Sequence, residues 1–297
     1  MRPLVSVIIP TYNRAHDLER AIKSVVAQSY QDWEILIVDN HSVDETDGVV
    51  AGIGDSRVHL LKIHNEGVIA KSRNFGIENA QGAYIAFLDS DDWWTSEKLK
   101  QSVKALDSGG DVIYHDLFIA VSQEQTNFTK RLVSSEPIFP MFSSLLCTGM
   151  SIPNSSVVVR RELLTKIGGL SENPDLIATE DYDTWIRLSR LTEQFVRLPE
   201  CLGYYWMGGG NASAASPRQL SRIKALYAQY LDDLPAFERN RAEGFLAYRV
   251  GRISQAHRDH RGAAASFRKA MSCPIDSSYR LKALLFFLVC LKKGWFL

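Results

Sequence analysis

Short runs of hydrophobic residues alternate with segments of helical periodicity through the first 120 residues of the chain. The runs that predict strands are residues 4–9, 34–39, 58–63, 83–89 and 111–116. Between the first two runs, apolar residues recur at the spacing of one helix face, at Leu18, Ile22, Val25 and Val26. This alternation predicts an α/β fold in which crossover helices flank a mainly parallel sheet.

The pattern changes in the second half of the chain. Residues 155–170 predict a strand, a short helix and a Gly-Gly stop, residues 183–191 predict a further helix, and everything after Pro217 has helical periodicity. The segment 210–217, GNASAASP, has the composition of a linker. We therefore predict two domains, an α/β domain at 1–215 and a helical extension at 216–297.

One part of this extension resembles a single tetratricopeptide unit, namely residues 246–271. Because one such unit cannot bury its own apolar face, we expect a helical hairpin packed on the main domain.

The net charge of zero hides an asymmetry between these two parts. Residues 1–215 carry 19 Lys and Arg against 28 Asp and Glu, whereas residues 216–297 carry 15 against 6. The acidic part favours cation binding and argues against nucleic acid, and the basic tail could meet an acidic lipid, a nucleic acid or the acidic part itself. The four cysteines form no C-x-x-C pair and no signal peptide is recognised, which favours a cytoplasmic protein.

The hydrophobic run at 83–89 ends in a group of three carboxylates: Asp89, Asp91 and Asp92. Ligands of open α/β sheets gather at the carboxyl ends of the strands, where Thr11, Asn13 and Asp39 are also predicted to lie. Hard oxygen ligands of this kind can hold a divalent cation together with a nucleotide. The alternative is that the carboxylates cap the helix predicted to follow them.

Four motifs together resemble the inverting nucleotide-sugar glycosyltransferases of family 2, which have the GT-A fold. They are VSVIIPTYNR, VDN after the second strand, KSRNFGIENAQGAYIAFLDSDDWW and TEDYDTW, and they cover roughly residues 4 to 205. The resemblance implies transfer of a sugar from a nucleoside diphosphate, with uridine the expected nucleoside, to an acceptor hydroxyl. It also implies a divalent metal, Mn²⁺ or Mg²⁺, at the D-x-D motif.

The matching positions carry the family's roles over to this chain. Asp39 matches the carboxylate that hydrogen-bonds the base, Asp91 the metal ligand and Asp181 the general base. The residues implied to contact the donor are Pro10, Thr11, Tyr12, Asn13, Asp39, Arg73, Asp89 and Ser90. The residues implied on the acceptor side are Glu180, Trp185 and Asn154.

The chemistry of glycosyl transfer agrees with these residue types. A metal stabilises the departing diphosphate without proton transfer, and a carboxylate accepts the proton of the attacking hydroxyl. The chain departs from the family at Asn40 and His41, where V-D-D-G-S is common, which weakens the prediction of uracil. It also lacks the Q-x-x-R-W motif of processive members. The implied product is a surface polysaccharide or a lipid-linked oligosaccharide.

Two other functions stay open at this stage. A nucleotidyltransferase or sugar-nucleotide hydrolase also holds metal and nucleotide at strand ends, but related nucleotidyltransferases carry a Gly-rich basic signature where this chain has PTYNRAHD. A non-catalytic interaction protein could keep the fold while its tail binds a partner.

Several aromatic and basic residues have two interpretations. Trp93, Trp94 and Trp185 could stack on sugars or belong to the core, and His115 with Asp116 suits a turn better than catalysis. In the tail, Trp295 and Phe296 stand beside lysines, which suits peripheral association with an anionic inner membrane face. The alternative for the tail is an ordinary buried terminal helix with solvated arginines.

Overall fold

The computed structural model describes residues 4–209 and 217–294, and these residues form two compact units. A sheet unit contains the described residues of Met1–Pro137, Ser151–Glu172 and Arg190–Gly210. A helical unit contains those of Ile138–Met150, Asn173–Ser189 and Asn211–Leu297. Two segments from the first 215 residues thus pack with C-terminal helices. The linker and the boundary predicted at 215/216 lie outside the described residues, apart from Pro217.

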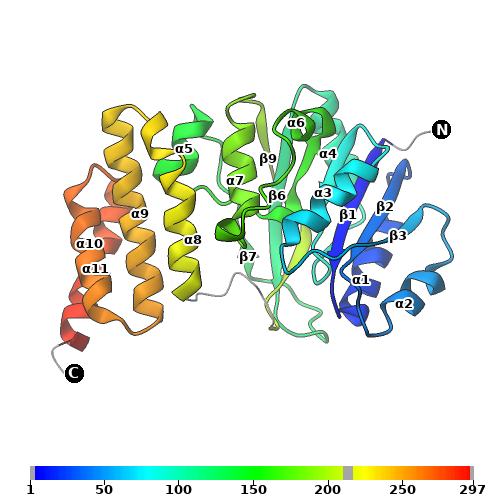
Figure 1. The fold of residues 1–297 in the computed structure, drawn as a ribbon, viewed down its shortest axis with the longest axis horizontal. Helices are drawn as coiled ribbons and strands as arrows, with labels where there is room; N and C mark the ends of the chain where they lie inside the picture. Colours follow the sequence, from blue (N-terminus) through cyan, green and yellow to red (C-terminus); the bar gives the residue numbers. More distant parts are fainter. Residues whose placement is uncertain (1–3, 210–216, 295–297) are drawn as a thin grey trace. The chain divides into compact units, whose positions relative to one another are not determined.

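The sheet unit contains all five strands that the hydrophobic pattern predicts, as β1, β2, β3, β4 and β6 (Figure 1). The strands are β1 (Val5–Thr11), β2 (Trp33–Asp39), β3 (Val58–Lys62), β4 (Tyr84–Phe87), β5 (Trp93–Trp94), β6 (Val112–Ala120), β7 (Arg131–Leu132), β8 (Val158–Arg160) and β9 (Phe195–Trp206). The helices of this unit are α1 (Ala15–Val26), α2 (Thr46–Ile53), α3 (Ile69–Asn79), α4 (Lys98–Asp107) and α6 (Arg161–Lys166).

The strands are hydrogen-bonded in the order β3-β2-β1-β4-β8-β6-β9-β5, with β7 paired to β6. The first four strands of this order are parallel, β8 is antiparallel to both of its neighbours, and β6 is parallel to β9. This is the predicted α/β sheet of GT-A type. The pattern did not predict β9, because Pro199 and Glu200 interrupt it at a bulge opposite Asp116.

Helices cover both faces of the central strands, which is why β1 and β2 are buried along their whole length. Val7 and Ile9 pack in one core with Leu18 of α1 and Leu99 of α4. Ile8 points to the opposite face, where α3 approaches closely. A Cβ atom at Gly76 of α3 would come within 2.7 Å of Ile8, so only glycine fits there.

The helical unit consists of α5 (Met141–Thr148), α7 (Glu180–Leu188), α8 (Pro217–Ala228), α9 (Ala236–Ala256), α10 (His260–Ser272) and α11 (Ser277–Gly294). The helices α9 and α10 form the hairpin that the tetratricopeptide-like pattern predicts. Gly251 of α9 lies against the ring of Phe267 of α10, where a Cβ atom would clash at 2.7 Å. Within the described stretches, no helix combines the length and the apolar character needed to cross a membrane. Trp295 and Phe296 lie outside these stretches.

Candidate active site

The candidate site lies at the carboxyl edge of three neighbouring parallel strands. Thr11 at the end of β1 is in register with Asp39 at the end of β2, and β4 pairs with the other side of β1 just before Asp89. Parallel strands end at the same edge, so the predicted donor residues of these strands gather there. The donor-side positions of the sequence thus fall on one side of the sheet unit.

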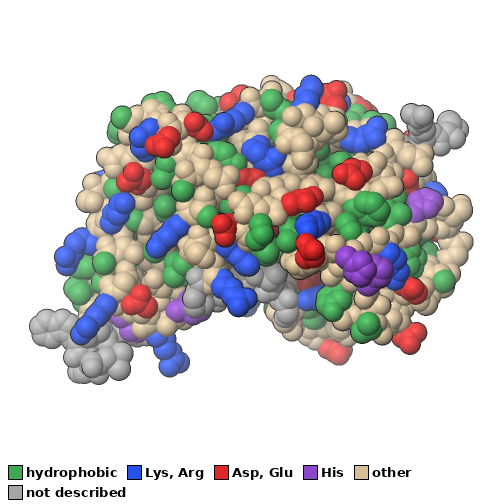
Figure 2. Space-filling view, in the orientation of Figure 1, with side chains coloured by type: hydrophobic (Ala, Val, Ile, Leu, Met, Phe, Trp, Pro, Cys, Tyr) green, Lys and Arg blue, Asp and Glu red, His purple; other side chains and the backbone are tan. Residues whose placement is uncertain are grey.

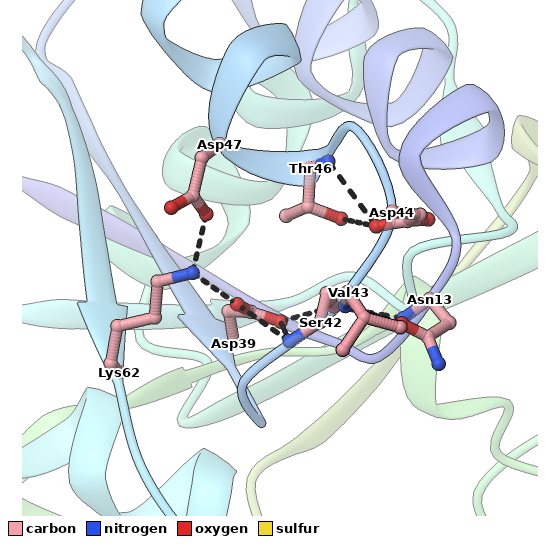
Figure 3. Close-up of polar contacts among 8 residues, drawn as sticks. All are labelled: Asn13, Asp39, Ser42, Val43, Asp44, Thr46, Asp47 and Lys62. Carbon is pink, nitrogen blue, oxygen red and sulfur yellow. Dashed lines mark hydrogen bonds and ion pairs between the residues drawn. The ribbon is translucent and has the colours of Figure 1, made fainter.

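Asp39 is completely buried and is surrounded by hydrogen-bond donors (Figure 3). Lys62 Nζ lies 2.6 Å from Asp39 Oδ2, and Ser42 donates both its backbone N–H, at 3.1 Å, and its hydroxyl to the carboxylate. Lys62 also pairs with Asp47, and these two carboxylates, Asp39 first, raise the pKa of Lys62. The buried charge of Asp39 is therefore compensated, while a carboxylate can still accept further bonds from a ligand.

The loop after β1 is fastened to the loop after β2. Asn13, whose φ is 51°, donates its backbone N–H to Ser42 Oγ at 2.8 Å and accepts from the N–H of Val43 at 2.8 Å through its side chain (Figure 3). The N–H of Asn40 donates to the carbonyl of Thr11 at 3.1 Å. Tyr12, which lies between Thr11 and Asn13 in the sequence, is 55% exposed, so its ring is available to a ligand.

A second cluster surrounds Asp89. Arg73, buried on α3, donates to Asp89 Oδ1 at 2.7 Å, and Asn154 donates to the same oxygen at 3.1 Å. The backbone N–H of Asp89 donates to Ser155 Oγ at 3.1 Å. Three residues that the sequence analysis singled out separately, Arg73, Asp89 and Asn154, therefore contact one another. Asn154, predicted for the acceptor side, thus contacts Asp89, which is predicted for the donor side.

Asp91 pairs with an arginine from the loop after β1. Arg14 Nη1 lies 3.1 Å from Asp91 Oδ2, and Arg20 of α1 donates to the backbone carbonyl of Asp91 at 2.7 Å. Burial, and then the charge of Asp89, raise the pKa of Asp91 to about 6, and Arg14 acts in the opposite direction. A half-buried carboxylate with a like charge nearby is a place that favours a cation.

The residues present fit a divalent metal in a limited way. Asp91 and Asp89 supply hard oxygen atoms, and the guanidinium of Arg14 already stands beside Asp91 as a cation. No group of three or more His, Cys, Asp or Glu side chains with metal-binding geometry occurs among residues 4–209 and 217–294. A metal held here would take most of its ligands from water and the donor diphosphate, as Mg²⁺ commonly does.

The third carboxylate of the motif has a structural role. Asp92 is 1% exposed, accepts a hydrogen bond from the N–H of Trp206 at 2.8 Å, and has its pKa raised well above the ordinary value by burial and the neighbouring carboxylates. It therefore anchors β9, and its burial disfavours the charged form of the carboxyl. The capping alternative for the cluster is wrong, because β5 intervenes and α4 begins only at Lys98, after Glu97.

The tryptophans have little surface left for sugars. Trp94 and Trp185 are 3% and 1% exposed, which favours the core interpretation. The ring of Trp93 is covered on one side by Arg20, at 4.0 Å, and stacks on Tyr204 with ring centroids 4.9 Å apart. His115 and Asp116 lie inside β6 instead of at its end, because this strand continues to Ala120.

Three acidic residues open α7 in the helical unit. Asp183 is buried and is engaged by Arg187, at 2.7 Å, and by the hydroxyl of Tyr230. Glu180 is also buried, at 4% exposure, whereas Asp181 is partly exposed. Asp181 is therefore the accessible carboxylate of the three.

Sequence reasoning missed four cationic and aromatic partners of the site: Arg14, Lys62, His41 and His64. Lys62 could have been found, because it ends β3 in register with Asp39. The rings of His41 and His64 stack with centroids 3.8 Å apart, and Asn40 Oδ1 accepts from the N–H of Asn65 at 2.9 Å. The two residues that depart from the family pattern, Asn40 and His41, thus join the loops after β2 and β3.

The fold and the carboxylates at its strand ends are those of a GT-A glycosyltransferase. Residues 6–168, more than half of the chain, match the family described as Glycosyl transferase family 2. The chain belongs to this family, and it is a glycosyltransferase.

Comparison with individual proteins supports the same fold. The chain is 29% identical over 223 residues to the UDP-Glc:alpha-D-GlcNAc-diphosphoundecaprenol beta-1,3-glucosyltransferase WfaP of Escherichia coli, covering 74% of this chain and 83% of that protein. The structure of S. aureus TarS 1-349 in complex with UDP-GlcNAc superposes with a TM-score of 0.69 at 17% identity, covering 99% and 91% of the two chains. A mannosyltransferase from Pyrobaculum calidifontis, in complex with GDP-Man and Mn²⁺, gives a TM-score of 0.61 at 19% identity, covering 99% and 88%.

Proposed function

We propose that this protein is a metal-dependent, inverting glycosyltransferase that moves a sugar from a UDP-sugar to a hydroxyl of a lipid-linked or surface glycan. The name of the Escherichia coli relative supports both the UDP donor and the diphosphoundecaprenol-linked acceptor. The complex of TarS with UDP-GlcNAc supports the same donor class. An acceptor of this kind supports a location at the cytoplasmic face of the cell membrane.

The observation that carries the proposal is a continuous series of contacts between Asp39 and Asp91. Asp39 accepts from Ser42, Ser42 accepts from Asn13, and Arg14, next along the chain, pairs with Asp91. Asp39, proposed to bind the base, and Asp91, proposed to lie beside the diphosphate, are thus connected through the loops after β1 and β2. A ligand with a polar base at one end and a diphosphate at the other suits this arrangement.

We assign the donor to the sheet unit. Asp39 would accept a hydrogen bond from the base, and the loop of Pro10, Thr11, Tyr12 and Asn13 would enclose it, with the exposed Tyr12 ring beside it. Asp89, held by Arg73 and Asn154 and followed by the buried Ser90, would orient the ribose or the sugar. Because Arg73 and Asn154 already hold the Asp89 carboxylate, this side chain would not have to be ordered when the donor binds.

Asp91 would hold the metal, with Asp89 nearby. When bound, Mn²⁺ or Mg²⁺ supplies charge stabilisation to the leaving diphosphate. The complex of the Pyrobaculum calidifontis mannosyltransferase with Mn²⁺ supports this proposal. Arg14 would have to share Asp91 with the metal or move away from it, because both are cations at one carboxylate.

Asp181 would act as the general base, with Glu180 in support and the buried Trp185 shaping the helix behind it. Its partial exposure supports this role, since Asp183 is already engaged by Arg187 and Tyr230. A single base that accepts the proton of the attacking hydroxyl, opposite the leaving group, produces inversion at the anomeric carbon. No nucleophilic side chain is required.

A thermal-shift panel tests the donor class. We expect UDP to raise the melting temperature more than GDP, dTDP or CMP, and we expect Mn²⁺ to enlarge this shift, because a ligand that binds the native state stabilises it by mass action. A larger shift with GDP would contradict the uridine assignment. An equal shift in EDTA would contradict the role of the metal.

An Asp181→Asn variant tests the base. We expect transfer to the acceptor to fall at least about a hundredfold while the UDP-induced shift in melting temperature stays unchanged. Asp175→Asn, at an exposed acidic residue of the same unit, is the matched control. Unchanged transfer by Asp181→Asn would remove this assignment. Donor hydrolysis that is as fast without acceptor as with it would favour the hydrolase alternative.

A further inference from the structure

The last helix of the structure exposes a stripe of large aliphatic side chains. These residues follow the i, i+3, i+4, i+7, i+8 and i+10 spacing of one helix face, and each is between 37% and 59% exposed. They are Leu281, Leu284, Leu285, Leu288, Val289 and Leu291. We call this surface the α11 stripe.

The opposite face of α11 already forms part of the helical core. Ala283 and Cys290 are fully buried, and Phe286 packs 5.7 Å from the ring of Phe267 on α10. Arg252 of α9 lies 4.0 Å over the ring of Phe286. The packing of α11 on α9 and α10 is thus satisfied without the α11 stripe, and an exposed apolar patch of this kind marks an interaction surface.

Positive charge surrounds this stripe. Lys282 and Lys292 are exposed on α11, and the helix contains no acidic residue from Ser277 to Gly294. The chain from 216 to 297 has 15 Lys and Arg against 6 Asp and Glu. Figure 2 shows Lys and Arg side chains among apolar ones over the region of α9, α10 and α11.

These charges decide between two occupants of the α11 stripe. A second copy of the same helix would bring lysines against lysines in either direction of pairing, because no acidic side chain on α11 can face them. An anionic lipid surface complements the lysines and accepts the leucines. We therefore propose that the α11 stripe inserts into the interface of an anionic membrane and holds the enzyme there.

This inference goes beyond the proposed reaction and does not depend on it, because lipid binding is measured without donor or acceptor. It differs from the expectation at the sequence level, which relied on Trp295 and Phe296. Here the leucines of the α11 stripe would make the contact with the membrane.

Vesicle flotation with the full chain tests the proposal. We expect the protein to float with vesicles of phosphatidylcholine and phosphatidylglycerol, and to float at least about tenfold less with phosphatidylcholine alone. The double variant Leu285→Gln/Leu288→Gln should lose at least about tenfold in binding to the anionic vesicles. Both side chains are more than half exposed, so the variant should keep the melting temperature of the wild type.

The matched control is Val121→Gln/Val133→Gln, which changes two valines of the sheet unit that are 56% and 57% exposed. We expect this control to float like the wild type. Equal flotation of the Leu285→Gln/Leu288→Gln variant, or absence of flotation of the wild type, would overturn the proposal. A wild-type dimer that the leucine variant converts to a monomer, without vesicle binding, would assign the stripe to a second copy instead.

Discussion

The guanidinium of Arg14 lies 3.1 Å from the carboxylate of Asp91. A positively charged side chain of the protein thus already contacts the residue that is predicted to bind the metal. Arg14 also lies 3.5 Å from Asp17, which gives it a second carboxylate to contact. A divalent metal at Asp91 would therefore have to compete with Arg14. The ion pairs of Arg14 compensate the charges of Asp91 and Asp17.

An Arg14→Gln variant should be less stable than the wild type in EDTA, by about 1 kcal/mol, because the carboxylate of Asp91 loses its ion-pair partner. Addition of Mn²⁺ should raise its melting temperature more than that of the wild type. Melting curves with EDTA and with Mn²⁺ measure both effects. Lys23→Gln, at an exposed cation of the following helix α1, is the control, and an equal Mn²⁺ response of the three proteins would rule out competition.

An Asp39→Asn variant should lower the free energy of unfolding by about 1–3 kcal/mol, because it removes the buried partner of Lys62. It should also abolish the UDP-induced shift. Asp47→Asn removes the exposed partner of the same lysine, with 68% of the Asp47 side chain accessible, and should cost less than about 0.5 kcal/mol. Urea unfolding with and without UDP makes the comparison, and equal effects of the two substitutions would contradict the assigned role of Asp39.

A Lys98→Met variant should be more stable than the wild type by about 1–3 kcal/mol. Lys98 is fully buried, its Nζ atom has no hydrogen-bond partner among the described residues, and it lies 3.6 Å over the ring of Trp94. Burial lowers the pKa of this amine well below the ordinary value. Methionine keeps the side-chain volume and removes the amine. A lower urea-unfolding midpoint of the variant than of the wild type would show that the Lys98 amine makes a stabilising interaction.

The free energy of unfolding should fall as the pH decreases, because His115 is buried. Burial, with Lys98 nearby, lowers the pKa of His115 to about 3, so the folded protein favours the neutral ring. The stability that the neutral His115 ring contributes is complete above the pKa of histidine in the unfolded chain, about 6.5. It is lost as the pH falls toward 3, at up to about 1.4 kcal/mol per pH unit. His115→Asn should flatten the pH dependence of the unfolding free energy between pH 6.5 and 4. An unchanged slope would assign the acid sensitivity to other groups.

A pair of substitutions at His41 tests the left-handed backbone conformation of this residue. His41 has a φ of 55°, which costs a non-glycine residue about 1 kcal/mol, and its stack on His64 offsets this cost. His41→Ala keeps the strain and loses the stack, whereas His41→Gly loses both. We therefore expect His41→Ala to be about 1 kcal/mol less stable than His41→Gly. The reverse order in urea unfolding would show that the φ of 55° imposes no strain on a residue with a Cβ atom.

The sequence by itself determined the parallel sheet and the positions of its terminal carboxylates. Hydrophobic periodicity located β1, β2, β3, β4 and β6, and parallel strands place Asp39, Asp89 and Asp91 at one edge. Such local patterns suffice because strand length and strand ends depend on neighbouring residues. The motif resemblance added the family.

Only the tertiary structure decided which side chains compensate these carboxylates and which of them are buried. Arg14 and Lys62 meet Asp91 and Asp39 across 77 and 23 positions of sequence, and the adjacent Asp91 and Asp92 differ because only Asp92 is sealed beneath β9. The same holds for α11, whose apolar residues are visible in the sequence while the face left uncovered is not. Burial and pairing depend on contacts between distant segments, which local periodicity does not specify.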